Sequence, residues 1–334
     1  MMAGQTVLSV ENVSVSFPGR SGDLTVVDDV SFTLAAGESL VIAGESGSGK
    51  SMICQSLLGI LPPQARVSGT RIDWLGRDLL QIADDKDWRS IRGAEIAMIF
   101  QDPTAALNPL ITVEHQISDA IRDHRQCSRA EARARTIEVL GMAGFPEPEH
   151  RMKSYPSELS GGLRQRVAIA LALSCGPKLI IADEATTNLD VSIQAQIVKL
   201  LRSLQQDLGL ALIFVTHDLG LAAQVGDKLL VMYAGHGVEQ GGVQQVLADP
   251  CHPYTRGLLR SAPTLQSSRA NPLRPIPGQA PKPGSIGKGS PFRSRCPVVV
   301  DGVCEVMRAP WTSAGPGHEV ACHRFARDGR EGVQ

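Results

Sequence analysis

Short apolar runs, each followed by glycine or by a polar side chain, recur through the first 250 residues. Runs of this length bounded by turn signals are typical of strands buried on both faces of a sheet. They lie at 40–43, 96–100, 179–182 and 211–215. Residues 191–208 instead have the spacing of an amphipathic helix. The pattern therefore predicts an α/β fold.

The chain ahead of the first buried run has a different pattern, in which apolar and polar residues alternate. The alternation covers 7–10 and 13–17, and strand-like residues follow at 26–27 and 31–34. Alternation with a period of two residues is typical of antiparallel strands with one buried face. We expect a small antiparallel sheet before the buried strand at 40–43.

The first buried run leads into a glycine-rich loop that is typical of phosphate binding. Its eight residues fit G-x-x-x-x-G-K-[ST] and are Gly44, Glu45, Ser46, Gly47, Ser48, Gly49, Lys50 and Ser51. In this pattern the glycines let backbone N–H groups converge on phosphates, the lysine reaches the β- and γ-phosphates, and the hydroxyl ligates Mg²⁺. The helix predicted to begin at Lys50 adds the positive end of its dipole. The alternative is a surface Gly/Ser loop that binds nothing.

The composition narrows the class of protein. With 334 residues and 43% hydrophobic content, the chain can bury a large core and form one big domain plus a smaller one. Its 33 basic and 34 acidic residues nearly balance, so bulk charge does not favour a nucleic acid as partner. The uncharged stretch at 167–177 is far shorter than the about 20 residues that cross a bilayer. No secretory signal precedes the first strand, so we expect the protein to stay in the cytoplasm.

Polar side chains follow three of the predicted strands. Gln101 follows the run at 96–100, and His217 follows the run at 211–215. Asp183 and Glu184 end the strand at 179–182, where two adjacent carboxylates are costly unless a cation offsets them. Open α/β sheets bind ligands at the carboxyl ends of their strands, so these side chains are candidates for a site.

A second possible anion site lies in the middle of the chain. Ser160 is a plausible N-cap, and Gly161 and Gly162 leave backbone N–H groups uncovered where the next helix begins. The alternative is a helix cap that binds no ligand. The region before it, at about 110–155, has helical periodicity and predicts an inserted helical lobe.

The motifs, and their order along the chain, resemble those of the ATP-binding subunits of ABC transporters. The resemblance is to the branch that imports oligopeptides, dipeptides and nickel. The resemblance implies that Asp183 holds Mg²⁺, that Glu184 is the general base for water, and that Gln101 contacts both Mg²⁺ and the water. The other implied nucleotide contacts are Phe17 on adenine, His217 on the γ-phosphate, Asp190, and Ser160 to Gly162 on ATP held by another subunit.

The resemblance also implies an architecture and a set of partners. The fold is a P-loop NTPase of ABC type over residues 1–250, a mixed sheet with an antiparallel β layer and a helical lobe at about 102–165. Two such ATPase subunits, identical or related, meet head to tail on ATP and Mg²⁺ at the cytoplasmic face of the membrane. They serve two membrane permease subunits and a separate solute-binding protein. The alternatives are the same machinery for nickel or another small solute, or a soluble ABC ATPase of DNA repair or translation.

Proline and glycine become dense after residue 250, which marks a boundary before a small irregular extension at 251–334. Residues 249–259 resemble the HPYT segment of peptide-importer ATPases. The spacing of Cys296, Cys304 and Cys322 resembles a terminal motif of that branch that holds a [4Fe–4S] cluster in some members, but Ser290 stands where the first cysteine is expected. A zinc site with a nearby histidine and three reduced free thiols are the alternatives.

Overall fold

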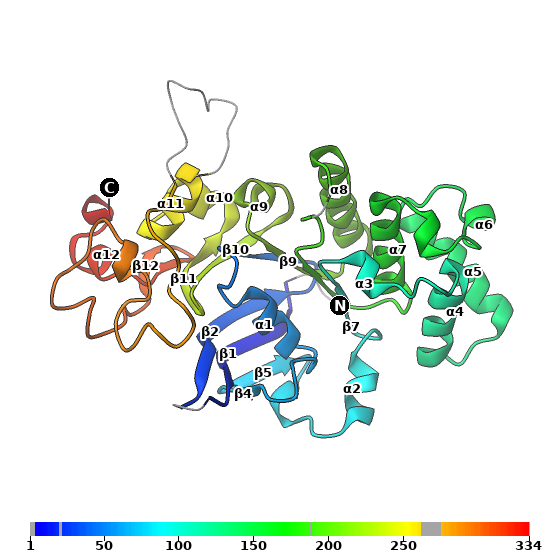
Figure 1. Ribbon diagram of the computed structural model, residues 1–334, viewed down its shortest axis with the longest axis horizontal. Helices are drawn as coiled ribbons and strands as arrows, with labels where there is room; N and C mark the ends of the chain where they lie inside the picture. Colours follow the sequence, from blue (N-terminus) through cyan, green and yellow to red (C-terminus); the bar gives the residue numbers. More distant parts are fainter. Residues whose placement is uncertain (1–3, 20–21, 188, 262–274, 334) are drawn as a thin grey trace. The chain divides into compact units, whose positions relative to one another are not determined.

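The computed structural model describes residues 4–19, 22–187, 189–261 and 275–333 (Figure 1). The chain divides into two compact units. The first unit comprises residues 1–5, 35–39 and 82–215. The second comprises 6–34, 40–81 and 216–334. Each unit contains both strands and helices, which confirms the expected α/β fold.

An antiparallel sheet in the second unit confirms the β layer expected from the N-terminal alternation. Its strands follow the order β2-β1-β5-β6, with β4 also paired to β1; they are β1 (Thr6–Phe17), β2 (Leu24–Ala35), β4 (Arg66–Ser68), β5 (Arg71–Trp74) and β6 (Arg77–Asp78). The two alternating runs merge into the single strand β1. Asn12 has a φ of 52° within it, and the alternation shifts by one residue there. Asparagine tolerates this left-handed backbone better than most residues.

A second sheet in the same unit carries the strand that precedes the glycine-rich loop. Strand β3 (Ser39–Ala43) pairs in parallel with β10 (Lys228–Tyr233), and β10 pairs antiparallel with β11 (His236–Gly242). Every residue of β3 is buried. The unit's helices are α1 (Lys50–Ser56), α9 (Leu219–Val225), α10 (Val243–Ala248), α11 (Pro253–Ser261) and α12 (His323–Asp328).

The C-terminal extension is more regular than the sequence predicts. Strand β13 (His318–Val320) pairs with β11, and β12 (Thr312–Gly315) pairs with β13, so the extension continues the sheet of the second unit. Expecting only irregular structure there was therefore wrong in part. Strands of three and four residues are too short to give a detectable alternation, which is why the pattern misses them.

The first unit contains three parallel strands whose ends carry candidate residues. Strands β7 (Ile96–Ile99), β8 (Leu179–Asp183) and β9 (Ala211–Thr216) pair in the order β7-β8-β9, and all residues of β8 and β9 are buried. Helix α8 (Val191–Leu208) has the bounds that its periodicity predicts. Helix α2 (Asp85–Ile91) precedes β7.

A cluster of helices follows β7 and corresponds to the expected helical lobe, drawn in teal to green in Figure 1. Its helices are α3 (Pro103–Ala106), α4 (Val113–His124), α5 (Arg129–Met142), α6 (Pro148–Arg151) and α7 (Gly161–Leu173). Helices α4, α5 and α7 pack against one another. Throughout the described ranges, every helix is too short or too polar to cross a bilayer.

Candidate functional site

The glycine-rich loop of the second unit has a shape that only glycine permits at two of its positions. Gly44 has a φ of 156°, and a Cβ there would lie 2.1 Å from the carbonyl oxygen of Met232. Gly49 has a φ of 95°, and a Cβ there would lie 2.9 Å from the carbonyl oxygen of Val26. The backbone therefore turns tightly between β3 and α1 because both side chains are absent.

Lys50 lies inside this loop. It is the first residue of α1 and is only 4% exposed. Its Nζ donates to the carbonyl oxygens of Gly44 at 2.9 Å and Glu45 at 3.0 Å. The loop thus holds an ammonium group against its own backbone, at the N-terminus of a helix that begins after a glycine cap. Charged phosphate oxygens are stronger hydrogen-bond acceptors than carbonyl oxygens. The Lys50 ammonium is therefore placed to replace its bonds to the loop carbonyls by bonds to a phosphate.

Glu184 and Gln101 meet at the ends of two neighbouring strands in the first unit. Strand β8 ends at Asp183, and Glu184 follows it in a left-handed backbone conformation with a φ of 46°. Its Oε2 accepts hydrogen bonds from Gln101 Nε2 at 3.2 Å and from Thr187 Oγ1 at 3.3 Å. Asp183, the last residue of β8, is 6% exposed. A carboxylate oriented by an amide and a hydroxyl can accept a proton from a bound water.

The two remaining motifs of the first unit are helix starts. Ser160 caps α7, with its Oγ accepting from the backbone N–H of Leu163 at 3.4 Å, and Gly161 and Gly162 form the first turn. A Cβ on Gly162 would lie 3.1 Å from Ile193 Cγ2, so α7 and α8 approach closely there. Asp190 caps α8 and accepts from the backbone N–H of Ile193 at 3.0 Å.

Phe17 and His217 each lie at a strand end. Phe17 is the half-buried last residue of β1, and His217 is exposed immediately after β9. The structure therefore places the predicted residues in two groups. The phosphate loop, Phe17 and His217 belong to the second unit, and the first unit contains Asp183, the Gln101–Glu184 pair and the two helix starts.

Two residues in contact with the phosphate loop are missed by the sequence analysis. Tyr254 of α11 and Arg295 of the C-terminal extension both bind Glu45. Tyr254 belongs to the HPYT segment, but nothing in the local pattern of either residue indicates where its side chain lies.

A lysine-bearing glycine loop, an oriented carboxylate at a strand end and a second glycine-rich helix start together define a P-loop NTPase. The comparisons with known proteins identify its family. The sequence model of the ABC transporter family matches residues 27–187. The model described as the C-terminal region of oligopeptide/dipeptide transporters matches residues 238–304.

Curated relatives match over nearly the whole chain. The dipeptide transport ATP-binding protein DppD of Bacillus subtilis is 46% identical over 319 residues, which covers 95% of this chain and 94% of the relative. The oligopeptide transport ATP-binding protein OppD of Salmonella typhimurium is 44% identical over 318 residues, or 95% of this chain and 93% of the relative. The chain belongs to the ABC transporter family and is one of its ATPases.

Solved structures agree with the fold. A dimeric ATP-binding cassette, MJ0796, in a post-hydrolysis state with ADP and Pi matches with a TM-score of 0.61 and 28% identity, over 71% of this chain and 98% of that chain. CbiO1 of Clostridium perfringens, part of an ABC transporter complex, matches with a TM-score of 0.63 and 30% identity, over 73% of this chain and 92% of that chain. The expected P-loop NTPase fold of ABC type is thereby confirmed.

Proposed function

We propose that this chain is the ATP-hydrolysing subunit of an importer for dipeptides or oligopeptides, acting as a peripheral protein at the cytoplasmic face of the membrane. The observation that carries the proposal is the Gln101–Glu184 pair at the ends of β7 and β8, in a chain that also has a complete phosphate loop. The C-terminal match to oligopeptide/dipeptide transporters supports the cargo class.

Each step of ATP hydrolysis has a residue suited to it. Lys50 and the loop amides offset the charge of the β- and γ-phosphates. The Ser51 hydroxyl, the Asp183 carboxylate and the Gln101 amide oxygen supply the hard oxygen ligands that Mg²⁺ prefers, and the ion would neutralise phosphate charge. Glu184 accepts the proton of the attacking water, and Gln101 orients its carboxylate.

Two ATPase subunits share each nucleotide in this proposal. The loop at 44–51 of one subunit holds the triphosphate, and the helix start at 160–162 of the other subunit covers the γ-phosphate with its N–H groups. The remaining nucleotide contacts are Phe17 on adenine, His217 on the γ-phosphate, and Asp190. The opening and closing of this pair, identical or related, drives two membrane permease subunits that receive cargo from a separate solute-binding protein.

Reconstitution of the transporter tests the proposal. The chain would be copurified with its membrane and ATPase partners, placed in vesicles with the solute-binding protein, and supplied with labelled dipeptide, labelled oligopeptide or Ni²⁺. We expect ATP-dependent accumulation of a peptide, with none when ADP replaces ATP. ATP-dependent uptake of Ni²⁺ alone would overturn the peptide assignment, and ATP hydrolysis without permease partners in the native membrane would favour a soluble ABC ATPase.

We further propose that Cys296, Cys304 and Cys322 hold a [4Fe–4S] cluster. Burial raises the pKa of the Cys296 thiol to about 11, and the nearby Cys322 and Cys304 thiols add to the shift. Burial also raises the pKa of Cys322. The three thiols are thus close enough for Cys304 and Cys322 to act on Cys296, and the raised pKa values keep Cys296 and Cys322 protonated at neutral pH until a cation displaces their protons.

The spacing of these thiols bears on the alternative of a single zinc ion. Within the described ranges, one set of three ligand-type side chains has all its donor atoms within 4.8 Å of one another, and that set is Glu239, Cys251 and His318. The sulfur atoms of Cys296, Cys304 and Cys322 are therefore not all within 4.8 Å of one another, which argues against one zinc ion bound by all three thiols as they lie.

Anaerobic purification followed by iron, sulfide and zinc analysis tests the metal assignment. We expect iron and sulfide in the wild-type protein and a loss of both in a Cys304→Ser variant, since a cluster with three thiolates has none to spare. Zinc in place of iron would assign a single-ion site. A metal-free protein with full ATPase activity would rule out both.

A further inference from the structure

Glu45, the second residue of the phosphate loop, is bound at three points. Its carbonyl oxygen accepts from Lys50 Nζ, which is a contact within the loop. Its backbone N–H donates to the hydroxyl oxygen of Tyr254 at 2.8 Å. Its carboxylate is bound by Arg295 with two parallel hydrogen bonds, Nη1 to Oε2 at 2.7 Å and Nη2 to Oε1 at 3.1 Å. The carbonyl oxygen also accepts from the Ser48 N–H within the loop, whereas the N–H and the carboxylate of Glu45 are bound from the chain that follows residue 250.

Arg295 is held rigidly in the position from which it reaches the loop. Its side chain is 5% exposed, and it also donates to the carbonyl oxygens of Ile276 and Pro277 and to the hydroxyl oxygen of Tyr233. The guanidinium lies 5.7 Å from the ring centre of Tyr233. The guanidinium that binds the Glu45 carboxylate is therefore also held by backbone acceptors of the extension.

An aromatic cluster fixes the second contact. The ring centres of Tyr233 and Tyr254 lie 4.5 Å apart, and Phe292 of the extension lies 5.4 Å from Tyr254. Burial lowers the pKa of His252 to about 4, so its neutral Nδ1 accepts from the backbone N–H of Tyr254 at 3.1 Å. The Tyr254 hydroxyl thus has little freedom to leave the loop.

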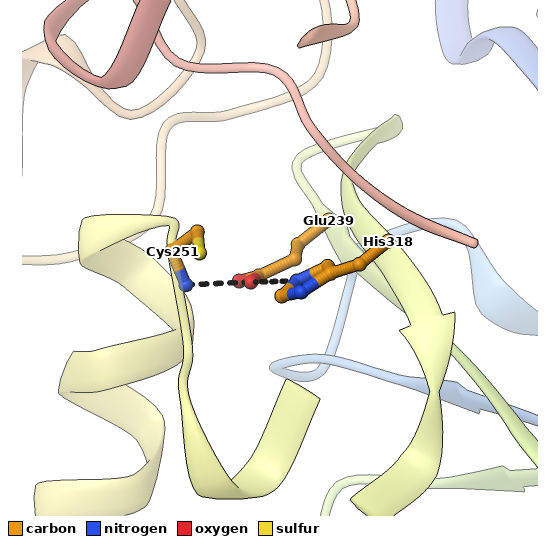
Figure 2. A group of neighbouring side chains, drawn as sticks. All are labelled: Glu239, Cys251 and His318. Atoms are coloured by element: carbon orange, nitrogen blue, oxygen red, sulfur yellow. Dashed lines mark hydrogen bonds and ion pairs between the residues drawn. The ribbon is translucent and has the colours of Figure 1, made fainter. Parts of the chain in front are cut away.

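A buried carboxylate anchors the start of the helix that carries Tyr254. Figure 2 shows Glu239 of β11 between Cys251 and His318 of β13. Its Oε1 accepts from the Cys251 N–H at 2.6 Å and pairs with His318 Nε2 at 2.8 Å, and its Oε2 accepts from the His252 N–H at 3.0 Å. Both oxygens are engaged, so this cluster connects β11 with β13 and with the residues just before α11.

We propose that the C-terminal extension sets the nucleotide affinity of the phosphate loop, with Arg295 neutralising and positioning Glu45 and Tyr254 fixing its backbone. The inference rests on the proposed function, in which the loop at 44–51 holds the triphosphate. Arg295 and Tyr254 act as positioning residues, because both reach the loop through Glu45.

The charge of Glu45 is the physical reason. A carboxylate within a loop that binds a triphosphate repels its ligand, and in a partly buried site this repulsion is weakly screened. The bidentate guanidinium cancels that charge and holds the carboxylate in one orientation. Without Arg295, the loop keeps its shape-forming glycines but carries an uncompensated negative charge. Affinity should then fall more for ATP than for ADP, because ATP carries the larger negative charge.

A double-variant experiment on the full chain tests this inference. ATP and ADP affinities would be measured by calorimetry for wild type, Arg295→Ala, Glu45→Gln and the double variant. We expect Arg295→Ala to weaken ATP binding by about tenfold or more, with a smaller loss for ADP, and the double variant to recover most of the loss. Arg308→Ala is the matched control. Arg308 also belongs to the extension, but it pairs with Asp28 at 2.6 Å and does not contact the loop. Its removal should leave the ATP and ADP affinities unchanged.

A subtler variant covers the case in which Arg295→Ala fails to fold. Tyr254→Phe removes one oxygen and keeps the aromatic cluster, and it should weaken ATP binding several-fold with an unchanged melting temperature. The inference would be overturned if Arg295→Ala or Tyr254→Phe binds ATP with wild-type affinity. It would also be overturned if Arg295→Ala loses ATP affinity and adding Glu45→Gln does not reduce that loss. If the wild-type chain itself fails to bind ATP, the proposed binding of ATP by the loop at 44–51 would be overturned instead.

Discussion

Glu184→Gln is expected to reduce ATP turnover by about 100-fold or more while leaving ATP affinity within about twofold of wild type. The substitution keeps the size of the side chain and an oxygen that can accept from Gln101, so the geometry at the ends of β7 and β8 should persist. An amide cannot take the proton of the attacking water, so the chemical step loses its base. Steady-state phosphate release and nucleotide binding on the same preparation would separate the two effects.

Glu138→Gln is the matched control for this variant. Glu138 lies on α5 in the same unit, pairs with Arg135 at 2.8 Å and is 58% exposed, so the same chemical change there should leave turnover unaltered. Near-normal turnover in Glu184→Gln would show that another group activates the water. Weakened ATP affinity with unchanged turnover would place Glu184 in binding and contradict its assignment as the base.

The residues for which sequence analysis succeeds are those whose role is set by local constraints. The buried runs that became β3, β8 and β9 are apolar throughout because both of their faces are covered. The glycines of the phosphate loop are recognisable because backbone sterics permit little else at Gly44 and Gly49. Ser160 is likewise the helix cap that its sequence position predicts, and caps have a strong residue preference.

The contacts that sequence analysis misses join positions that are far apart along the chain. Tyr254 and Arg295 bind a residue 209 and 250 positions away, and no periodicity encodes such a pairing. The short strand β13 is similar, because its place in the sheet depends on β11 and on the Glu239–His318 pair. Tertiary packing decides these features, so propensity and motif spacing give no sign of them.

Lys50→Ala is expected to weaken ATP binding by roughly 10- to 150-fold, which corresponds to losing about 1.5–3 kcal/mol of charge-assisted hydrogen bonding. The loop would keep its backbone N–H groups but lose the one ammonium that it encloses, which is 4% exposed. A ligand that binds only the folded state raises the melting temperature in proportion to the logarithm of its concentration over its Kd. Melting curves at increasing MgATP should therefore shift strongly for wild type and little for the variant.

Lys86→Ala on the exposed helix α2 controls for the loss of one positive charge, and it should show the wild-type shift with MgATP. Because Lys50 is buried and bonded to Gly44 and Glu45, the variant's melting temperature without nucleotide also has to be measured. A variant that melts like wild type without nucleotide, and still shows the full shift with MgATP, would mean that the phosphates are held elsewhere than in the loop at 44–51. We expect the variant to keep its fold and to lose the shift with MgATP, because the φ values and the absent side chains of Gly44 and Gly49 are unchanged in it.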